Sequence, residues 1–471
     1  MPLNILLLTA DDMDFHTPGP FGGPPGVTPA LDRLAATGMT FHRAHVVAAV
    51  CQPSRSAIMS GKLPHRNGAE GFEPIAEDVR VLTDLLRPAG YLAGILGKVD
   101  HLQPVEKFGW DLTRTMQQLG LGRDPHAYGR ATAEFIDDAT RQDRPWFLMA
   151  NAHDPHRPFH GSAAEAAKWT PEQLAAVPAP SRTYSAGTHP VPGFLPDLPD
   201  VRTEVAEYLS SSRRCDDVVS AVLTALRDSG QADRTVVVFL SDNGMAFPFA
   251  KANCYLQSTR TPLVIRWPGV TRPGSRDEDT LFTTLDLLPT LCDAAEVDPP
   301  GDVDGASLLP LLRDGTDARE HGPIVTVFHE TSAKRRFEMR CVQDRRYGYI
   351  WNAWSDGEQQ YVAENMDGLT WAAMERAAAG DHAVRQRVEL YRQRVPEELY
   401  DLDADPHSQR NLVAQPGVRP VLDAMRAILS EWMDRHADPL LDRYPYATRP
   451  GATQRPSPIE GGTRSAQDCE D

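Results

Sequence analysis

Short apolar runs that end in polar residues recur through the N-terminal part of the chain and predict buried strands. Runs of this length without strict alternation are typical of strands covered on both faces, as in a parallel sheet. Acidic, amide or basic residues follow most of them, so polar side chains are expected at the carboxyl ends of the strands. The predicted strands span residues 4–9, 91–96, 146–150, 235–240 and 262–267.

Helical patterns separate these strands. The first begins with Thr28 as a candidate cap and Pro29 in the first turn, and it ends before Gly38. Strands that alternate with helices predict an α/β domain with a large, mostly parallel sheet flanked by helices. In such sheets ligands bind at the carboxyl ends of the strands. The predicted helices span residues 29–37, 81–89, 128–140, 203–229 and 281–294.

The pattern changes at about residue 323, where short strands follow one another without long helices between them. A closing helix follows at 421–434, and the end of the chain is rich in Pro, Gly, Ser and charge. We therefore predict a larger domain at 1–322 that holds the site, a smaller α+β domain with a short antiparallel sheet at 323–445, and a disordered tail at 446–471. The strands predicted for the smaller domain are 324–328, 337–343 and 346–351.

Two segments rich in turn-forming residues interrupt the larger domain. Residues 17–26 are dense in Pro and Gly and are expected to line a surface or a cleft. Residues 161–200 are rich in Pro and Ala, and we interpret them as a long excursion over the site.

Composition restricts the class of partner. The chain has 471 residues, of which 41% are hydrophobic and 24% charged, as in ordinary soluble globular proteins. Its formal net charge of −17 argues against non-specific binding of nucleic acid, which needs a basic face. A pocket for an anionic substrate would therefore have to gather its Lys, Arg and His locally.

The N-terminal residues and the cysteines add two expectations. The first strand is too short for a signal sequence and no run is long enough to span a membrane, so the sequence predicts a cytoplasmic protein. Six cysteines lie apart without Cys-x-x-Cys spacing, which fits neither a zinc site nor a disulfide framework.

Four oxygen-bearing side chains follow two of the predicted strands. Asp11 and Asp12 come after the first, and Asp242 and Asn243 come after the strand at 235–240. Three carboxylates and an amide suit a hard divalent cation, Ca²⁺ or Mg²⁺, better than zinc. Taken singly, either pair would more often be a cap or a strand-ending turn. Their shared place at one sheet edge favours a metal site.

The segment Cys51-Gln52-Pro53-Ser54-Arg55 fits a nucleophile held at the entrance of a helix. Pro53 suits the first turn, and Arg55 lies on the same helical face as Cys51, one turn along. Free N–H groups and a guanidinium together favour an anion site. His153 could simply brace its loop. The candidates for holding an anion are Arg55, Lys98, His101, His156 and Lys251, each of which singly would more often be a solvated or satisfied side chain.

Together these motifs resemble the type I sulfatases of the alkaline-phosphatase superfamily. Cys-x-Pro-Ser-Arg with Gly61 is similar to the family signature, and other family motifs occur in family order. Within the family the chain is most similar to the heparan N-sulfatases, through His65-Arg66-Asn67-Gly68, Phe247-Pro248 and a cation at Lys251. The other motifs are Asp11-Asp12, Gly97-Lys98 with His101, Asp154-Pro155-His156, Ser241-Asp242-Asn243-Gly244, Glu398-Leu399-Tyr400-Asp401-Leu402, Asp405-Pro406 and Asn411-Leu412.

The resemblance implies a mechanism. A maturation enzyme would convert Cys51 to Cα-formylglycine, whose hydrate attacks the sulfur of a sulfate ester or sulfamate and is later restored as the aldehyde. Arg55 and Lys98 would steady the formylglycine, and His101 would take a proton as sulfate leaves. Lys251 and His156 would bind the sulfate, with His156 protonating the leaving group. The residues implied to hold Ca²⁺ are Asp11, Asp12, Cys51, Asp242 and Asn243.

Two departures bear on the substrate. The family commonly has Lys-x-His, whereas here the spacing is Lys98-Val99-Asp100-His101, as in iduronate-2-sulfatase-like members. Lys251 stands where heparan N-sulfatases have arginine and most other sulfatases have lysine. Sulfate binding is therefore expected in either case, on a sulfated sugar such as N-sulfoglucosamine.

Two competing interpretations remain. One is a phosphonate monoester hydrolase or phosphodiesterase of the same superfamily, although those enzymes usually have Asp-His where this chain has Asp242-Asn243. The other is a sulfated-glycan binder whose Cys51 is never matured. In the smaller domain, His329, Glu330 and Arg340 could reach the sugar or simply form salt bridges. The relatives would suggest a homodimer.

Overall fold

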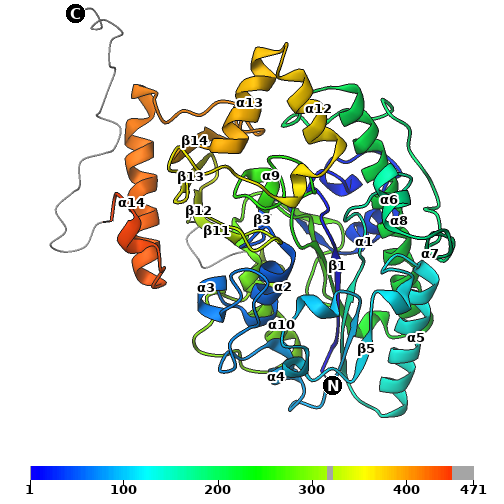
Figure 1. Cartoon of the computed structure of the whole chain (residues 1–471). Coiled ribbons are helices and arrows are strands. Elements are labelled where there is room, and N and C mark those ends of the chain that lie inside the picture. The colour runs from blue at the N-terminus through cyan, green and yellow to red at the C-terminus, as the bar shows by residue number, and fades with distance from the viewer. Residues whose placement is uncertain (1, 316–321, 448–471) are drawn as a thin grey trace, which may run out of the picture.

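The computed structural model describes residues 2–315 and 322–447, and its centre is an eight-stranded sheet (Figure 1). The strand order is β5-β4-β6-β1-β7-β8-β2-β9, and only β8 runs antiparallel to its neighbours. A two-stranded pair, β3 (Ala44–His45) and β10 (Phe282–Thr283), lies apart from it. The strands of the large sheet are β1 (Asn4–Ala10), β2 (Met39–Phe41), β4 (Leu92–Leu96), β5 (Leu112–Arg114), β6 (Trp146–Asn151), β7 (Thr235–Ser241), β8 (Leu263–Arg266) and β9 (Ser275–Asp277).

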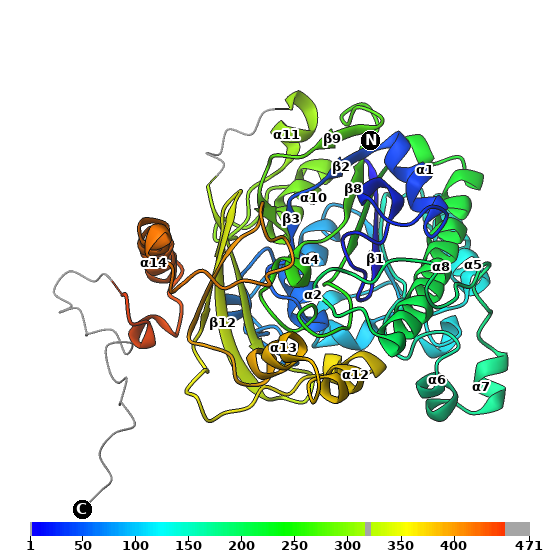
Figure 2. The same cartoon turned by 90° about the horizontal axis from the view of Figure 1, so that it is seen from above.

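Helices cover both faces of this sheet, as the view from above shows (Figure 2). Alternate residues of β1 explain the continuous apolar run: Ile5 and Leu7 pack with one set of helices, and Leu6 and Leu8 pack with the other. A strand buried on both faces needs apolar residues at every position. The first set is α2 (Cys51–Ser60), α4 (Leu82–Leu86) and α10 (Leu287–Ala295), and the second is α1 (Pro29–Thr37), α5 (Pro125–Arg141) and α8 (Pro199–Asp228).

A smaller antiparallel sheet follows, in the order β11-β12-β13-β14. On one face α14 (Arg419–Arg435) packs through Leu422 and Leu429, and Figure 2 shows this helix beyond the smaller sheet. The other face shares a core with α12 (Leu369–Ala377), α13 (His382–Gln393) and the N-terminal half of α8. The strands are β11 (Ile324–Glu330), β12 (Arg336–Gln343), β13 (Tyr347–Asn352) and β14 (Glu397–Asp401).

The predicted fold class is confirmed, with several corrections to single elements. The helix predicted at 281–294 begins only at Leu287, because β10 and a 3-10 turn occupy the residues before it. The helix predicted at 81–89 is shorter and ends at Leu86. The excursion at 161–200 contains α6 (Ala163–Lys168) and α7 (Pro171–Ala175). The elements that the pattern did not predict include β14, α12, α13 and the short helices α3 (Pro64–Asn67), α9 (Leu256–Thr259) and α11 (Leu309–Asp314).

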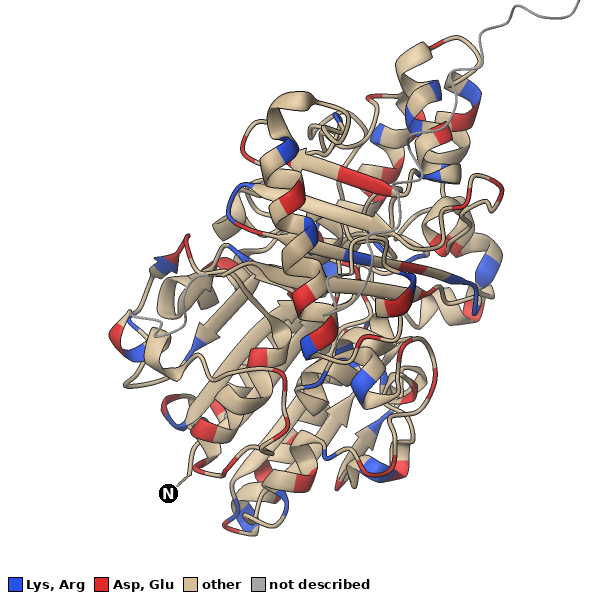
Figure 3. Ribbon diagram, turned by 90° about the vertical axis from the view of Figure 1, so that its left-hand side faces the viewer, with Lys and Arg blue, Asp and Glu red and all other residues tan. Residues whose placement is uncertain are grey.

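The division of the chain into domains and a disordered tail stays a prediction. The domain boundaries at 322 and 445 are such expectations, and residues 448–471 of the predicted tail lie outside the described residues. Among the described helices, none combines the length and the apolar character needed to cross a bilayer. On the side drawn in Figure 3, basic and acidic residues are interspersed along the same helices and loops.

Candidate active site

The four oxygen-bearing side chains predicted to hold a metal meet where β1 and β7 end. These strands are parallel neighbours, and Ala10 pairs with Ser241, so the residues that follow them emerge side by side. The Asp12 backbone N–H donates to Asp242 Oδ1 at 3.1 Å. Asn243 Nδ2 donates to Asp12 Oδ1 at 2.7 Å. The side chains of all four residues, including Asp11, are fully buried, so the sheet alone brings three carboxylates and an amide together.

Helix α2 carries Cys51 to the same place. The helix begins at Cys51, after extended Val50, and Pro53 lies in its first turn as predicted. Cys51 Sγ donates to Asp11 Oδ1 at 3.3 Å, and Lys251 Nζ donates to Sγ, also at 3.3 Å. Burial, together with the charge of Asp11, raises the pKa of the Cys51 thiol well above its ordinary value. The residue is therefore poorly suited to act as a thiolate.

Arg55, one turn after Cys51, ties three strand ends together. Its Nε and Nη2 donate to Asp242 Oδ2 at 3.0 and 2.7 Å. Its Nη1 donates to Thr9 Oγ1 at 2.8 Å and to Asn151 Oδ1 at 2.6 Å. The guanidinium is fully buried, and its donors face the strand ends. Sequence reasoning assigned no role to Thr9, the last residue of one predicted strand, or to Asn151, which follows another.

Lys98 and His101 follow β4. Lys98 has a left-handed backbone, with φ of 54°, and its Nζ forms an ion pair with Asp11 Oδ2. His101 ends a 3-10 turn, Val99–His101, and lines the cavity described below. Burial and the charge of Lys98 lower the pKa of His101 to about 2, so its imidazole is neutral. The longer Lys-to-His spacing therefore still brings His101 to the site.

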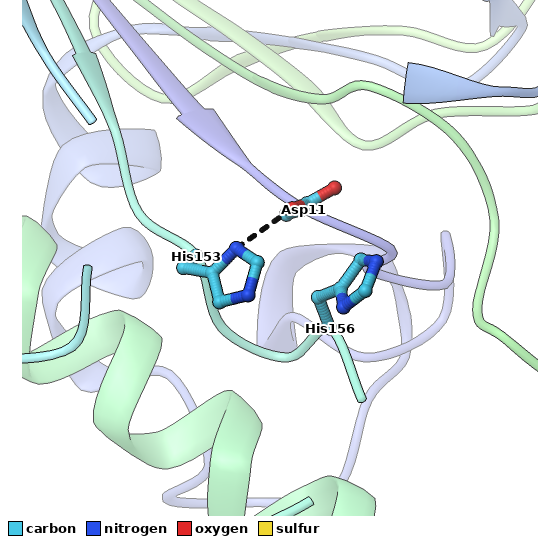
Figure 4. A group of neighbouring side chains, drawn as sticks. All are labelled: Asp11, His153 and His156. Atoms are coloured by element: carbon cyan, nitrogen blue, oxygen red, sulfur yellow. Dashed lines mark ion pairs between the residues drawn. The ribbon is translucent and has the colours of Figure 1, made fainter. Parts of the chain in front are cut away.

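The loop after β6 brings two histidines towards Asp11, as Figure 4 shows. His153 Nδ1 lies 3.2 Å from Asp11 Oδ2, and the His153 and His156 rings stack with centroids 4.8 Å apart. His156 Nδ1 lies 2.6 Å from the Arg157 carbonyl oxygen, a distance that fits an Nδ1–H donor, and Nε2 lies 3.9 Å from Asp12 Oδ2. His153 thus braces Asp11, while the free nitrogen of His156 faces the site.

Lys251 closes the loop that follows β7. Its Nζ lies 2.7 Å from Asp12 Oδ1 and 3.3 Å from Cys51 Sγ. Burial alone would lower the pKa of Lys251, but the negative charge of Asp12 outweighs it and raises this pKa well above its ordinary value. Asn365, from the smaller sheet's part of the chain, donates to the Lys251 carbonyl oxygen at 2.5 Å. No motif surrounds Asn365, and sequence reasoning missed it.

Arg157 links this centre to the C-terminal helices. Its Nε and Nη2 donate to the Ala246 carbonyl oxygen at 3.0 and 2.8 Å, and it forms an ion pair with Glu204 of α8. Glu204 in turn accepts hydrogen bonds from the first backbone N–H groups of α12, at Leu369 and Thr370. One guanidinium therefore connects the loop of His156, the loop of Lys251 and the start of α12.

The donor set fits a hard divalent cation. The side-chain oxygen of Asn243 is buried and has no hydrogen-bond partner within the described part of the chain. Asp11, Cys51 and Asp242 form one group with ligand atoms close enough to share an ion, and Asp11, His153 and His156 form another. Burial raises the pKa of Asp242 to about 7, whereas the charge of Lys98 and its neighbours overcomes burial and holds the pKa of Asp11 well below its ordinary value. A buried carboxylate cluster with an unpaired amide oxygen suits a metal ion.

A cavity of about 700 Å³ opens from Cys51 to the surface. His101, His156 and Lys251 line its inner end, which is thus rich in cationic and imidazole groups. The residues that line it from the C-terminal part are Ser332, Glu364, Asp367, Gly368, Leu369 and Ala372.

The three residues expected to reach a sugar from the smaller domain are elsewhere. None of them is among the residues that line the cavity. Arg340 is buried and donates to Asp438 Oδ2 at 2.6 Å, which agrees with a salt-bridge role. His329 Nδ1 lies 3.5 Å from Glu70 Oε1, and Glu330 lies against Gly71. A sugar in the cavity would instead meet the segment before α12.

Comparison with known proteins agrees with this fold and site. The family model described as Sulfatase matches residues 3–297, and one described as N-sulphoglucosamine sulphohydrolase, C-terminal, matches residues 246–361. The chain therefore belongs to the sulfatase family, with an alkaline-phosphatase-like fold, and it is an enzyme of the sulfatase class. The family resemblance inferred from the motifs is thereby confirmed.

One named relative and two solved structures are also similar to this chain. Human N-sulphoglucosamine sulphohydrolase is 30% identical, over 93% of this chain and 91% of the human protein. A solved structure described as a complex with its substrate D-glucosamine-2-N,6-O-disulfate has a TM-score of 0.69 at 19% identity, covering 94% of this chain and 99% of that one. Phosphonate monoester hydrolase of Agrobacterium radiobacter has a TM-score of 0.66 at 21% identity, covering 92% and 96%. The two structural likenesses show the fold alone.

Proposed function

We propose that the enzyme removes the sulfo group from a sulfated sugar of the N-sulfoglucosamine type, as a sulfamate or sulfate ester, through a formylglycine made from Cys51. One observation carries the proposal: the reactive side chain lies 3.3 Å from both Asp11 Oδ1 and Lys251 Nζ, at the inner end of a sugar-sized cavity. The match of residues 246–361 to the N-sulphoglucosamine sulphohydrolase model and the human relative support the choice of sugar.

Asp11, Asp12, Asp242 and Asn243 would hold Ca²⁺, with Mg²⁺ as the alternative, beside residue 51. When bound, the cation supplies a Lewis acid next to the nucleophile and the sulfo oxygens. Arg55 fixes the orientation of Asp242 through two hydrogen bonds and would thereby hold it ready for this ion. Elemental analysis of the purified enzyme tests the assignment, and a transition metal at full occupancy would favour the Asp11, His153 and His156 group instead.

Maturation must precede turnover. Conversion of Cys51 to formylglycine is a two-electron oxidation in which oxygen replaces sulfur on the β-carbon, and we assign it to a separate maturation enzyme that brings its own oxidant. Water then adds to the aldehyde and gives two hydroxyl groups on one carbon. The buried, protonated thiol of the unmodified residue would be a poor substitute.

The catalytic cycle has two bond exchanges. In the first, one hydroxyl of residue 51 gives its proton to the neighbouring carboxylate cluster and its oxygen bonds to sulfur. The bond from sulfur to the sugar nitrogen or oxygen breaks, and His156, once doubly protonated beside the bound anion, gives its Nε2 proton to the leaving atom. In the second, the other hydroxyl gives its proton to His101, the carbon–oxygen bond to the sulfo group breaks, and sulfate leaves. Lys251, beside residue 51, neutralises the sulfo oxygens throughout.

Mass spectrometry of the tryptic peptide 44–55 tests the nucleophile. Protein co-expressed with a maturation enzyme should give a peptide lighter by the difference between a CH₂SH and a CHO group. A peptide that stays in the cysteine form, together with absent turnover, would contradict the proposal and favour a non-catalytic glycan binder.

A substrate panel tests the sugar. N-sulfoglucosamine should be turned over faster than glucosamine 6-sulfate, 2-O-sulfated uronate, 4-nitrophenyl sulfate and phenyl phosphonate monoesters. Turnover of aryl sulfates alone would remove the N-sulfoglucosamine assignment but keep the sulfatase chemistry. Preferred hydrolysis of the phosphonate would overturn both.

A further inference from the structure

A second cavity, of about 660 Å³, lies behind the catalytic one. The Pro- and Gly-rich loop after β1 forms part of its wall, and so does the segment around Val191 in the long excursion. Both segments were predicted to line a cleft or cover the site, and neither takes part in the chemistry proposed above. No residue lines both cavities.

The two cavities share a dividing wall. Helix α8 presents Val205 and Leu209 to the second cavity, and it presents Glu204 and Glu207 to the catalytic one. The loop between β7 and Lys251 alternates in the same way, with Met245 on one side and Ala246 on the other. The second cavity is therefore separate from the catalytic centre but only one layer of side chains away.

The lining of the second cavity is mostly apolar, with a single guanidinium among its polar groups. Arg260 Nε donates to the His42 carbonyl oxygen at 2.8 Å, and the guanidinium carbon lies 3.6 Å from the centre of the Phe15 ring. Arg260 forms no ion pair with a carboxylate in the described part of the chain. Burial, with the charge of Arg43, lowers the pKa of Arg260 to about 10, so it remains charged at neutral pH.

Arg260 is half-buried, and a partly buried cation without a close ion pair is stabilised by an anion that binds beside it. A second polar group on the same wall is also unsatisfied: Gln257 is 7% exposed, and both polar atoms of its amide lack a partner among the described residues. The one carboxylate on the wall, Asp14, accepts the backbone N–H of His16 at 2.9 Å. The negative charge of Asp14 partly offsets the lowering of the Arg260 pKa, but the two side chains form no ion pair in the described part of the chain.

We propose that this cavity is a second ligand site, which takes a ring-bearing organic anion with its carboxylate or sulfo group on Arg260. Ligand sites of this size are typically apolar with one or two charged or polar groups that fix orientation. A guanidinium binds a carboxylate or sulfo group through two parallel hydrogen bonds, and Phe15 and the proline-rich wall offer apolar surface to a ring. The site goes beyond the proposed function and does not depend on it.

Calorimetric titration with 2-naphthoate tests the site, with the neutral 2-naphthalenemethanol as matched probe. In the full-length protein Arg260→Met should weaken naphthoate binding about tenfold, the value of one charge-assisted contact, and leave the neutral probe within about twofold. Arg266→Met, which alters a half-buried arginine on β8 outside both cavities, should change neither. Equal binding of naphthoate by the parent and Arg260→Met would overturn the proposal.

Two further variants separate this site from the catalytic cavity and from misfolding. Cys51→Ala should bind naphthoate as the parent does, and loss of binding in that variant would place the probe in the catalytic cavity and overturn the proposal. Val191→Trp adds bulk to the wall of the second cavity and leaves the Arg260 side chain in the sequence. It should abolish binding of both probes while thermal unfolding and turnover of 4-nitrophenyl sulfate persist, and undiminished binding would likewise overturn the proposal.

Discussion

The inner end and the rim of the catalytic cavity differ in how their charges are held. At the inner end, Asp11, Asp12 and Asp242 are fully buried, and Arg55, Lys98 and Lys251 are paired with them. At the rim, Glu364 is half-buried and Asp367 is exposed, and neither forms an ion pair in the described part of the chain. The fixed pairs belong to strand ends and α2, whereas the rim carboxylates belong to α8, at Glu207, and to the segment between β13 and α12.

This difference indicates that the inner end carries the reaction and that the rim selects the substrate. Buried pairs hold their geometry because breaking one leaves a charge in a low-dielectric interior. Rim carboxylates keep contact with water and can exchange partners at small cost. We therefore expect changes at the inner end to abolish turnover or stability, and changes at the rim to adjust them.

The largest effect is expected for Cys51→Ser. A serine can be sulfated, but its ester has no second hydroxyl to expel sulfate, so turnover should fall about a thousandfold or more and a sulfo group should remain on residue 51. Mass spectrometry after incubation with 4-nitrophenyl sulfate detects the adduct. Cys292→Ser, at a buried cysteine of α10, serves as the control and should retain activity. Full activity of Cys51→Ser would show that the inner end does not need an aldehyde.

Arg55→Met tests the rigidity of the inner end. The change leaves Asp242 buried without the guanidinium that donates to it, and the free energy of unfolding should fall by about 3–5 kcal/mol. Urea denaturation measures the loss. Arg202→Met breaks an exposed pair with Asp197 and should leave stability unchanged. If both variants lost equally little stability, the buried ion pairs would not be what holds the inner end of the cavity rigid.

The sequence predicts the residues at the inner end of the cavity better than those at its rim. Asp11 and Asp242 were predictable because parallel strands end at one sheet edge and polar residues follow apolar runs there. The pairing of Ala10 with Ser241 made the two sets of ligands neighbours, as expected. The partners of Arg55 were less visible, since Thr9 and Asn151 are single polar residues near the ends of β1 and β6, where one polar residue has no distinctive pattern.

The contacts at the rim could not be predicted because they depend on how segments far apart in the sequence pack together. Asn365 contacts the Lys251 carbonyl oxygen across 114 positions of sequence, and only the packing of the smaller sheet and α12 against α8 brings it there. His329 and Arg340 have the chemistry expected of sugar-binding residues, but the antiparallel pairing of β11 and β12 turns them towards other partners. Residue type alone does not reveal which face of a strand meets a cavity.

Arg157→Lys tests the link between the two ends of the cavity. Lysine cannot keep the two hydrogen bonds to the Ala246 carbonyl oxygen and the pair with Glu204 together, so His156 should lose its alignment. Turnover of N-sulfoglucosamine, whose nitrogen needs a proton to leave, should fall about tenfold to a hundredfold. Turnover of 4-nitrophenyl sulfate, whose leaving group needs none, should change less than about twofold.

The comparison of the two substrates is the decisive measurement for Arg157. Arg182→Lys, at an arginine stacked on Tyr184 away from the catalytic cavity, is the matched control and should affect neither substrate. An equal loss on both substrates would mean that Arg157 supports the fold rather than proton transfer.

The smallest effect is expected at the rim, in the pH dependence of Glu207→Gln. Burial and the charge of Glu204 raise the pKa of Glu207 to about 7, above its value in an unfolded chain. The folded protein then holds a proton that the unfolded chain releases, so Glu207 lowers stability as pH rises from its unfolded pKa towards 7. Glu207→Gln should therefore raise the melting temperature slightly at pH 8 and leave it unchanged at pH 4. Glu389→Gln, at an exposed glutamate of α13, provides the matched control. Parallel curves for parent and Glu207→Gln would show that the rim does not titrate in this range.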